Sequence, residues 1–127
     1  MVQAEAAILI GIGGLLGANA RYLVSVWAAR RIGPNFPYGT LIVNLSGSLL
    51  LGFLVTVIAS LGAYQREVQL LVPLGFVGAY TTFSTFAYES VGLLRRRAYG
   101  LAATNVLGST MLGLLGAWIG IVVARAI

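Results

Sequence analysis

The sequence contains neither cysteine nor histidine among its 127 residues. Disulfide-bonded scaffolds, thiol catalysis and metal sites built from cysteine and histidine are therefore excluded. Charged residues are also scarce, at 9% of the chain, whereas hydrophobic residues make up 59% and the mean hydropathy is +0.95. A soluble domain of this size would leave much of that apolar surface in water. The composition predicts an integral membrane protein.

Four apolar stretches account for nearly the whole chain. A membrane-spanning helix needs about 20 residues, and each stretch is long enough. We expect spans at residues 4–29, 40–61, 68–94 and 99–124, joined by short loops. Residues 1–127 are thus predicted to form a single all-α transmembrane domain. The net charge of +5 does not indicate a nucleic-acid partner, because most arginines lie at the ends of apolar stretches, where they anchor to lipid headgroups.

The third stretch is interrupted near its centre by the sequence GFVGAYTTFSTFAYE, residues 75–89. It contains two glycines, two adjacent threonines, and a Ser-Thr pair between two phenylalanines. Glycine is a poor helix former, and hydroxyl groups can bond to backbone groups that a break has freed. Irregular backbone at membrane depth is tolerated only where protein buries it or where it lines a wet cavity. The pattern predicts a helix broken at mid-membrane, with a binding or permeation site beside the break.

The second and fourth stretches each carry a polar stripe. Asn44 and Ser48 are four residues apart, as are Asn105 and Ser109, so each pair shares one helix face. Such residues can form interhelical hydrogen bonds that only hold the bundle together. They can also donate into a polar pathway, the interpretation that we favour for Asn44. Two polar-striped helices and one broken helix are enough to line a narrow route.

Two ionisable residues allow alternative interpretations. Arg21 lies one turn beyond Gly17 on a face of small residues. It either extends to the membrane interface or lies at the mouth of an aqueous vestibule that attracts anions. Glu89 is either a carboxylate of the vestibule, which we favour, or a polar group at the end of its span. The three consecutive arginines Arg95–Arg97 indicate a helix C-terminus that is anchored to lipid headgroups.

These residues limit the kind of solute that could pass, but they do not identify it. A cation or proton pathway usually needs carboxylates inside the membrane, and only Glu89 of the three acidic residues could lie there. Neutral hydrogen-bond donors and the positive edges of aromatic rings suit a small hydrated anion. The carbonyl groups of a broken helix also suit a bound cation.

Three stretches resemble the signature segments of the Fluc (CrcB) family of fluoride channels. They are GGLLGANARY at residues 13–22, GTLIVNLSGS at 39–48 and GFVGAYTTFSTFAYE at 75–89. The resemblance covers nearly the whole chain, including its length and number of spans. It implies a multi-pass protein of the bacterial plasma membrane that exports cytoplasmic fluoride passively. It also implies an antiparallel, dual-topology homodimer with two fluoride pores.

The resemblance further implies roles for particular residues. It places fluoride beside the phenylalanines Phe83 and Phe86, the asparagine of the second span, and the polar track of the fourth span, which here are Asn44, Asn105 and Ser109. Ser84 and Thr85, the neutral donors between the two rings, complete the residues that we expect to line the fluoride pore. It implies a structural sodium ion at the dimer interface, held by the backbone carbonyls of Gly78 and Thr81. Leu101 stands at a position that is often polar in relatives, which shortens the polar track of the fourth span.

Other hypotheses remain open from the residues alone. A small four-helix multidrug exporter has a similar size, but it relies on a carboxylate in the middle of its first span, and this chain has only Glu5 at the start. A non-transporting membrane scaffold would use the same asparagines as bundle contacts. Dual topology also predicts little charge bias, whereas two loop or terminal arginines fall on the side of the termini and five on the other side.

Overall fold

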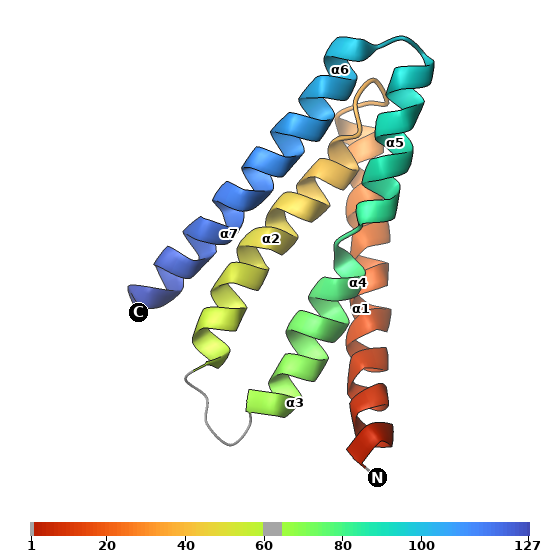
Figure 1. Cartoon of the computed structure of the whole chain (residues 1–127). Helices are drawn as coiled ribbons and strands as arrows, with labels where there is room; N and C mark the ends of the chain where they lie inside the picture. Colours follow the sequence, from red (N-terminus) through yellow and green to blue (C-terminus); the bar gives the residue numbers. More distant parts are fainter. Residues whose placement is uncertain (1, 60–64) are drawn as a thin grey trace.

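The computed structural model describes residues 2–59 and 65–127, and within these ranges the chain consists of long helices lying side by side (Figure 1). The first two spans are α1 (Val2–Arg31) and α2 (Tyr38–Ile58). The third span is built from α3 (Gln65–Gln69), the π-helical η2 (Leu70–Val77), α4 (Gly78–Tyr80) and α5 (Phe83–Arg95). The fourth comprises α6 (Tyr99–Ala103), the π-helical η3 (Thr104–Gly108) and α7 (Ser109–Arg125).

Four segments of the described chain are long and apolar enough to cross a membrane, as the sequence predicts. They cover Gln3–Arg31, Tyr38–Ile58, Gln65–Arg95 and Tyr99–Arg125. The observed ends lie within a few residues of the expected ones, except that the expected end of the second span, residues 60 and 61, lies outside the described residues. Both termini lie at the same end of the bundle, and the connections after α1 and after α5 lie at the other (Figure 1).

Glycine allows pairs of helices to approach closely. A Cβ atom added at Gly17 would lie 2.9 Å from the carbonyl carbon of Phe76 in η2, and one added at Gly120 of α7 would lie 2.8 Å from the amide nitrogen of Phe53 in α2. Small residues one turn apart, Gly13 and Gly17 in the first span and Gly116 and Gly120 in the fourth, predict such close packing from the sequence, and the structure confirms it. Because no side chain separates the backbones, α1 packs tightly against the third span and α2 against the fourth.

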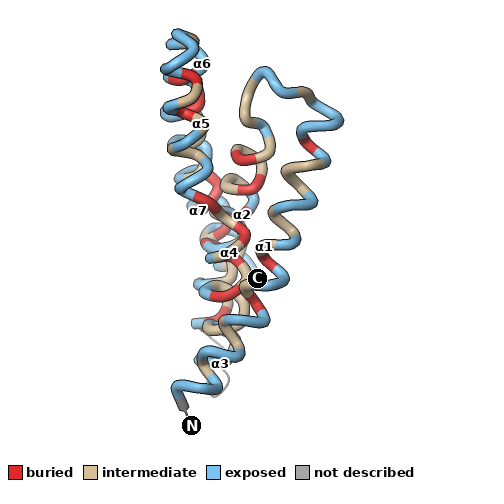
Figure 2. The backbone as a smooth tube through the Cα atoms, turned by 90° about the vertical axis from the view of Figure 1, so that its right-hand side faces the viewer, coloured by how far each residue is buried: buried red, intermediate tan, exposed pale blue. Residues whose placement is uncertain are grey.

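Most of the helix surface is uncovered within one chain. Figure 2 shows exposed residues along nearly the full length of each helix, with buried residues confined to scattered turns. The exposed side chains include large apolar ones such as Tyr22 (67%), Met111 (67%) and Trp118 (60%). A chain that spans a membrane covers such surfaces with lipid or with another protein.

The third span is broken, as expected, and the break lies at its two adjacent threonines. Thr81 and Thr82 are extended, with φ/ψ of −74°/158° and −150°/117°. Gly75 is helical and lies where an added Cβ would be 3.1 Å from the Cα of Gly13, so it serves helix packing. Gly78 is also helical, at φ −60° and ψ −36°. The span is further disturbed before the break, where Pro73 lies inside the π-helical segment.

The C-terminus of α5 is capped by Arg97, which adopts the left-handed backbone conformation although it is not a glycine. Arg97 has φ 58°, its amide donates to Leu94, and the amide of Ala98 donates to the carbonyl of Leu93. These two bonds form a Schellman motif, in which glycine is the usual left-handed residue. For any other residue the left-handed region costs about 1 to 2 kcal/mol.

We therefore expect Arg97→Gly to stabilise the protein by about 1 kcal/mol. Thermal unfolding in detergent should show a midpoint a few degrees higher. Arg96→Gly is the matched control, because Arg96 has an ordinary φ of −82° and gains nothing from glycine. An equal or larger stabilisation by the control would contradict the explanation.

Candidate functional site

The break in the third span is held by the amide side chain of Asn44. Its Nδ2 donates to the carbonyl of Thr82 at 2.9 Å, and its Oδ1 accepts from the amide of Thr82 at 2.8 Å. The two bonds replace backbone partners that an unbroken helix would have given to Thr82. Asn44 of α2 thus forms an interhelical hydrogen bond directly at the break, which is the interpretation that we did not favour from the sequence. A role of Asn44 in the pathway stays a prediction.

Thr82 then begins the second half of the span. Its side-chain oxygen accepts from the amide of Thr85 at 3.2 Å, which is the usual cap of a helix N-terminus. The same hydroxyl lies 3.0 Å from the hydroxyl of Thr85 and 3.4 Å from that of Ser84. Sequence reasoning missed Thr82 as a positioning residue, although a threonine directly before an amphipathic segment is a recognisable start signal.

The predicted anion-facing groups lie around the first turn of α5, next to the break. The rings of Phe83 and Phe86 are tilted by 45° with centroids 5.9 Å apart. Phe83 is 78% exposed, the hydroxyl residues Ser84 and Thr85 are exposed as well, and Phe86 is half-buried. Thr85 faces a cavity that Ser25 and Thr40 also line. The four consecutive residues therefore lie together at the start of α5 but point in different directions around the helix.

Arg21 reaches the break from α1. Its Nη1 lies 3.5 Å from the carbonyl oxygen of Thr81, a long hydrogen bond. The guanidinium group therefore points into the bundle at the level of the break, which is not the geometry of an arginine extended to the membrane surface. It adds positive charge beside the neutral donors of the first turn of α5.

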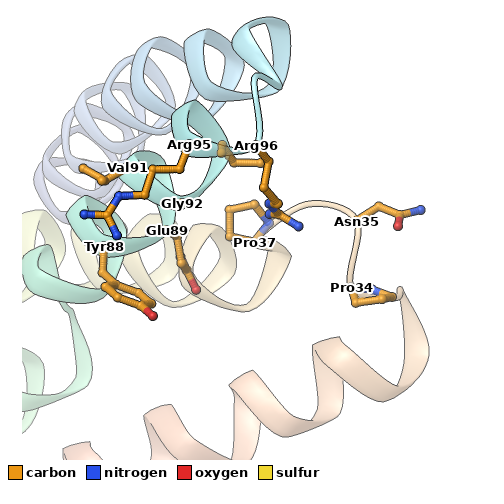
Figure 3. Close-up of a pocket in the computed structure, with 10 residues that line it drawn as sticks. Pro34, Asn35, Pro37, Tyr88, Glu89, Val91, Gly92, Arg95 and Arg96 are labelled. Atoms are coloured by element: carbon orange, nitrogen blue, oxygen red, sulfur yellow. The ribbon is translucent and has the colours of Figure 1, made fainter.

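Glu89 lies between two cavities. The larger, of about 590 Å³, opens between α5 and the connection after α1, and Figure 3 shows Glu89 and Arg95 of α5 across from Pro34 and Pro37. The smaller, of about 260 Å³, also includes Ser25, Thr40 and Thr85 among its lining residues. The Oε2 atom of Glu89 is buried with no hydrogen-bond partner in the described chain, and the Thr40 side chain lies within reach of the carboxyl group. This position fits the vestibule interpretation better than the span-end interpretation.

Asn105 and Ser109 connect the fourth span to α5. Asn105 is 1% exposed, its Nδ2 donates to the Ser90 hydroxyl at 2.9 Å, and the Ser109 hydroxyl donates to its Oδ1 at 3.3 Å. Ser90 in turn donates to the carbonyl of Phe86 at 2.7 Å. The two asparagines therefore bind the third span at separate levels, one at the break and one two turns later. Sequence reasoning missed Ser90, whose only signal is its position one turn after Phe86.

Leu101 lies in a mixed environment. It is 42% exposed and lines a cavity of about 280 Å³ together with Tyr38, Thr104 and Ser109. Phe36, Leu41 and Leu112 also line this cavity, so Leu101 interrupts the polar track of the fourth span within a mostly apolar lining.

A metal ion in the described chain would have to bind backbone oxygens. The described residues contain no cluster of three or more histidine, cysteine, aspartate or glutamate side chains. The amide of Thr82 bonds to Asn44, which leaves the carbonyl of Gly78 without the donor that it would have in an unbroken helix. The carbonyl of Thr81 faces Arg21 at the limit of hydrogen bonding. The carbonyl oxygen of Gly78 thus fits a hard cation, which prefers oxygen ligands, whereas the carbonyl of Thr81 already faces the positive charge of Arg21.

Known proteins share this sequence along nearly its whole length. A model of the family described as "CrcB-like protein, Camphor Resistance (CrcB)" matches residues 8–121. The chain is 48% identical to "Fluoride-specific ion channel FluC 1" of Geobacillus kaustophilus over 120 residues, which cover 94% of this chain and 98% of the relative. It is 42% identical over 118 residues to "Fluoride-specific ion channel FluC" of Acidobacterium capsulatum, covering 93% and 94% of the two chains.

Proposed function

The chain belongs to the CrcB-like family, whose relatives named above are fluoride-specific ion channels, and from this premise we propose that fluoride passes along the face of the break in the third span. The protein is accordingly a multi-pass membrane channel and not an enzyme. The observation that carries the proposed route is the exposed group Phe83, Ser84 and Thr85 at mid-span, directly beside the break. Neutral donors and ring edges can replace part of the hydration shell of fluoride without holding the ion too tightly.

The route needs a second copy of the chain. A single chain leaves Phe83 (78%) and Tyr88 (82%) uncovered, so the face of α5 would be open to lipid. Exposed hydroxyls and unwound backbone in lipid are costly, whereas a partner chain can enclose them. An antiparallel homodimer would bring two such faces together and give two equivalent pores. An antiparallel dimer requires that the chain insert into the membrane in both orientations. We propose this dual topology although the distribution of the arginines favours one orientation.

Sodium is proposed as the structural ion of that dimer. The carbonyl oxygens of Gly78 and Thr81 would hold it, and a second copy would supply the same two groups. A bound cation would neutralise the partial negative charge of carbonyls that have lost their helix partners. This chain's contribution is to hold those carbonyls in place through the bonds between Asn44 and Thr82.

Arg21 and Glu89 are proposed to shape the two approaches to the route. Arg21 beside the break raises the local concentration of anions. Glu89 separates two cavities near the other end of α5, where its carboxyl group and Thr40 offer a polar passage between them.

Fluoride efflux from proteoliposomes, followed with a fluoride electrode, tests the proposed function. We expect purified protein to release trapped fluoride far faster than protein-free vesicles, and to leave chloride largely inside. Cross-linking in the same vesicles should give dimers and no larger species. Purified, folded protein that releases no fluoride would refute the channel; fluoride flux from a monomer would refute the dimer alone.

A further inference from the structure

We propose that Ser90 is a positioning residue for fluoride conduction: its hydroxyl group fixes the orientation of the Asn105 amide and keeps one N–H of that amide available to the ion. The inference rests on the proposed function, because it concerns the same route. It starts from a directed chain of hydrogen bonds that runs from Ser109 through Asn105 and Ser90 to the Phe86 carbonyl.

The direction of this chain follows from the proton of Ser90. A serine hydroxyl has one proton to donate, and Ser90 gives it to the carbonyl of Phe86 at 2.7 Å. Towards Asn105, the Ser90 oxygen can therefore only accept. The atom of Asn105 that lies 2.9 Å away must be the nitrogen, which donates. Ser90 is 7% exposed and Asn105 is 1% exposed, so water offers no easy substitute.

The opposite orientation of the amide is disfavoured at Ser90. With the amide turned by 180°, the oxygen of Asn105 would face the oxygen of Ser90 with no proton between them. Two acceptors in contact inside a protein leave both groups unsatisfied, which is costly. The Ser109 hydroxyl, which donates to Oδ1 at 3.3 Å, could instead accept from the turned amide, so it is Ser90 that selects the orientation.

The fixed amide has one N–H left over. Asn105 carries two N–H groups on its nitrogen, and Ser90 accepts only one of them. Among the described residues the structure gives no acceptor for the other. A neutral N–H that is oriented but not used is the kind of donor that can bind an anion weakly and release it. Because Asn105 is 1% exposed, an ion reaches this N–H only when the side chains around it move aside. Asn105 lies in the π-helical turn η3, and such turns frequently mark functional sites.

The hydroxyl of Ser90 also connects this donor to the aromatic pair. It bonds the carbonyl of Phe86, whose ring lies 5.9 Å from that of Phe83. Loss of the hydroxyl would therefore release the Asn105 amide and loosen its link to the turn that carries Phe86.

The first test compares fluoride efflux among variants at position 90. We expect Ser90→Ala to slow efflux by about tenfold, the factor expected when one buried hydrogen bond is lost. Ser90→Thr should return efflux to within about twofold of wild type, because a threonine hydroxyl can also bond the carbonyl four residues back. Thr110→Val is the matched control: the Thr110 hydroxyl bonds the Val106 carbonyl at 2.7 Å, as Ser90 bonds Phe86, but it bonds no side chain of the residues that the structure describes.

The second test asks whether Ser90 acts through Asn105. In an Asn105→Ala background, Ser90→Ala should cause little further loss, because the group that it positions is gone. The proposal is overturned if the two losses multiply, if Ser90→Ala conducts like wild type, or if Thr110→Val lowers efflux as much as Ser90→Ala does.

A measurement without transport separates this inference from the proposed function. In nitrogen-15 NMR spectra of the protein in nanodiscs, the two side-chain N–H signals of Asn105 should shift or broaden in Ser90→Ala and return in Ser90→Thr. Unchanged signals in Ser90→Ala would defeat the inference even if the channel conducts fluoride. Conversely, wild-type protein without fluoride flux would defeat the proposed function, while the spectra would still decide whether Ser90 orients Asn105.

Discussion

Asn44→Ala should lower fluoride efflux by about thirtyfold or more. The substitution removes both bonds to the backbone of Thr82, at 2.9 and 2.8 Å, and leaves an N–H and a carbonyl of the break without partners. Each unsatisfied buried polar group costs about 1 to 3 kcal/mol, and every 1.4 kcal/mol corresponds to a factor of ten. The extended turn would then rearrange, and with it the start of α5 that carries Phe83. Efflux from proteoliposomes at equal protein density measures the effect.

Asn19→Ala is the control for Asn44→Ala. The Asn19 amide lies on an exposed face of α1 and bonds only the carbonyl of Leu15 in its own helix, at 2.7 Å. Its loss changes no contact with the third span, so we expect efflux within about twofold of wild type. The importance of the bonds to Thr82 would be disproved if Asn44→Ala conducted normally, or if both variants lost activity equally.

Gly17→Ala should destabilise the whole protein, against the trend for glycine in helices. A Cβ at this position would lie 2.9 Å from the carbonyl carbon and 3.1 Å from the Cα of Phe76, and backbone atoms cannot turn aside as a side chain can. Overpacking of this kind costs about 1 to 3 kcal/mol. The α1 helix would have to move away from η2 and would carry Arg21 away from the break. The unfolding midpoint in detergent and the yield of folded protein should both fall.

Gly11→Ala on the same helix isolates the cause. An added Cβ at Gly11 meets no atom within 4 Å, so the substitution brings only the better helix propensity of alanine, about 1 kcal/mol. We expect the unfolding midpoint to stay level or rise. If both variants changed stability in the same direction and by the same amount, close packing at Gly17 would not be its explanation.

Several features of the site could be predicted from the residues themselves. Helix-weakening and hydroxyl residues in an apolar stretch predicted a broken third span, since backbone that leaves a helix in a membrane needs local partners. An asparagine one turn into the second span showed that a partner was needed, since an unpaired amide is costly there, but the sequence favoured a pathway role over the hydrogen bond across helices that the structure shows. Small residues at one-turn spacing predicted close packing at Gly17 and Gly120, which the structure confirms.

Other features could not be predicted, because they depend on which partner a residue meets. Glycines and threonines occur together in residues 75–89, and the sequence alone did not say which residue would hold the break. The break falls at Thr81 and Thr82 because Asn44 supplies their partners there, while the backbone of α1 needs Gly75 to remain helical and bare. The role of Ser90 could not be predicted either. It depends on contact with Asn105, and a single serine gives no periodic pattern in the sequence.

By itself, the sequence determined that this protein lies in a lipid bilayer, that it has four membrane spans, and which of these spans could not remain a continuous helix. Hydropathy and helix propensity are local properties, so a single stretch is enough to read them. Only the tertiary structure decided where the third span opens, which atom of Asn105 faces Ser90, and that Arg21 points to the break. Those outcomes depend on hydrogen bonds between residues from 15 to 60 positions apart, whose directions are fixed only when the helices pack together.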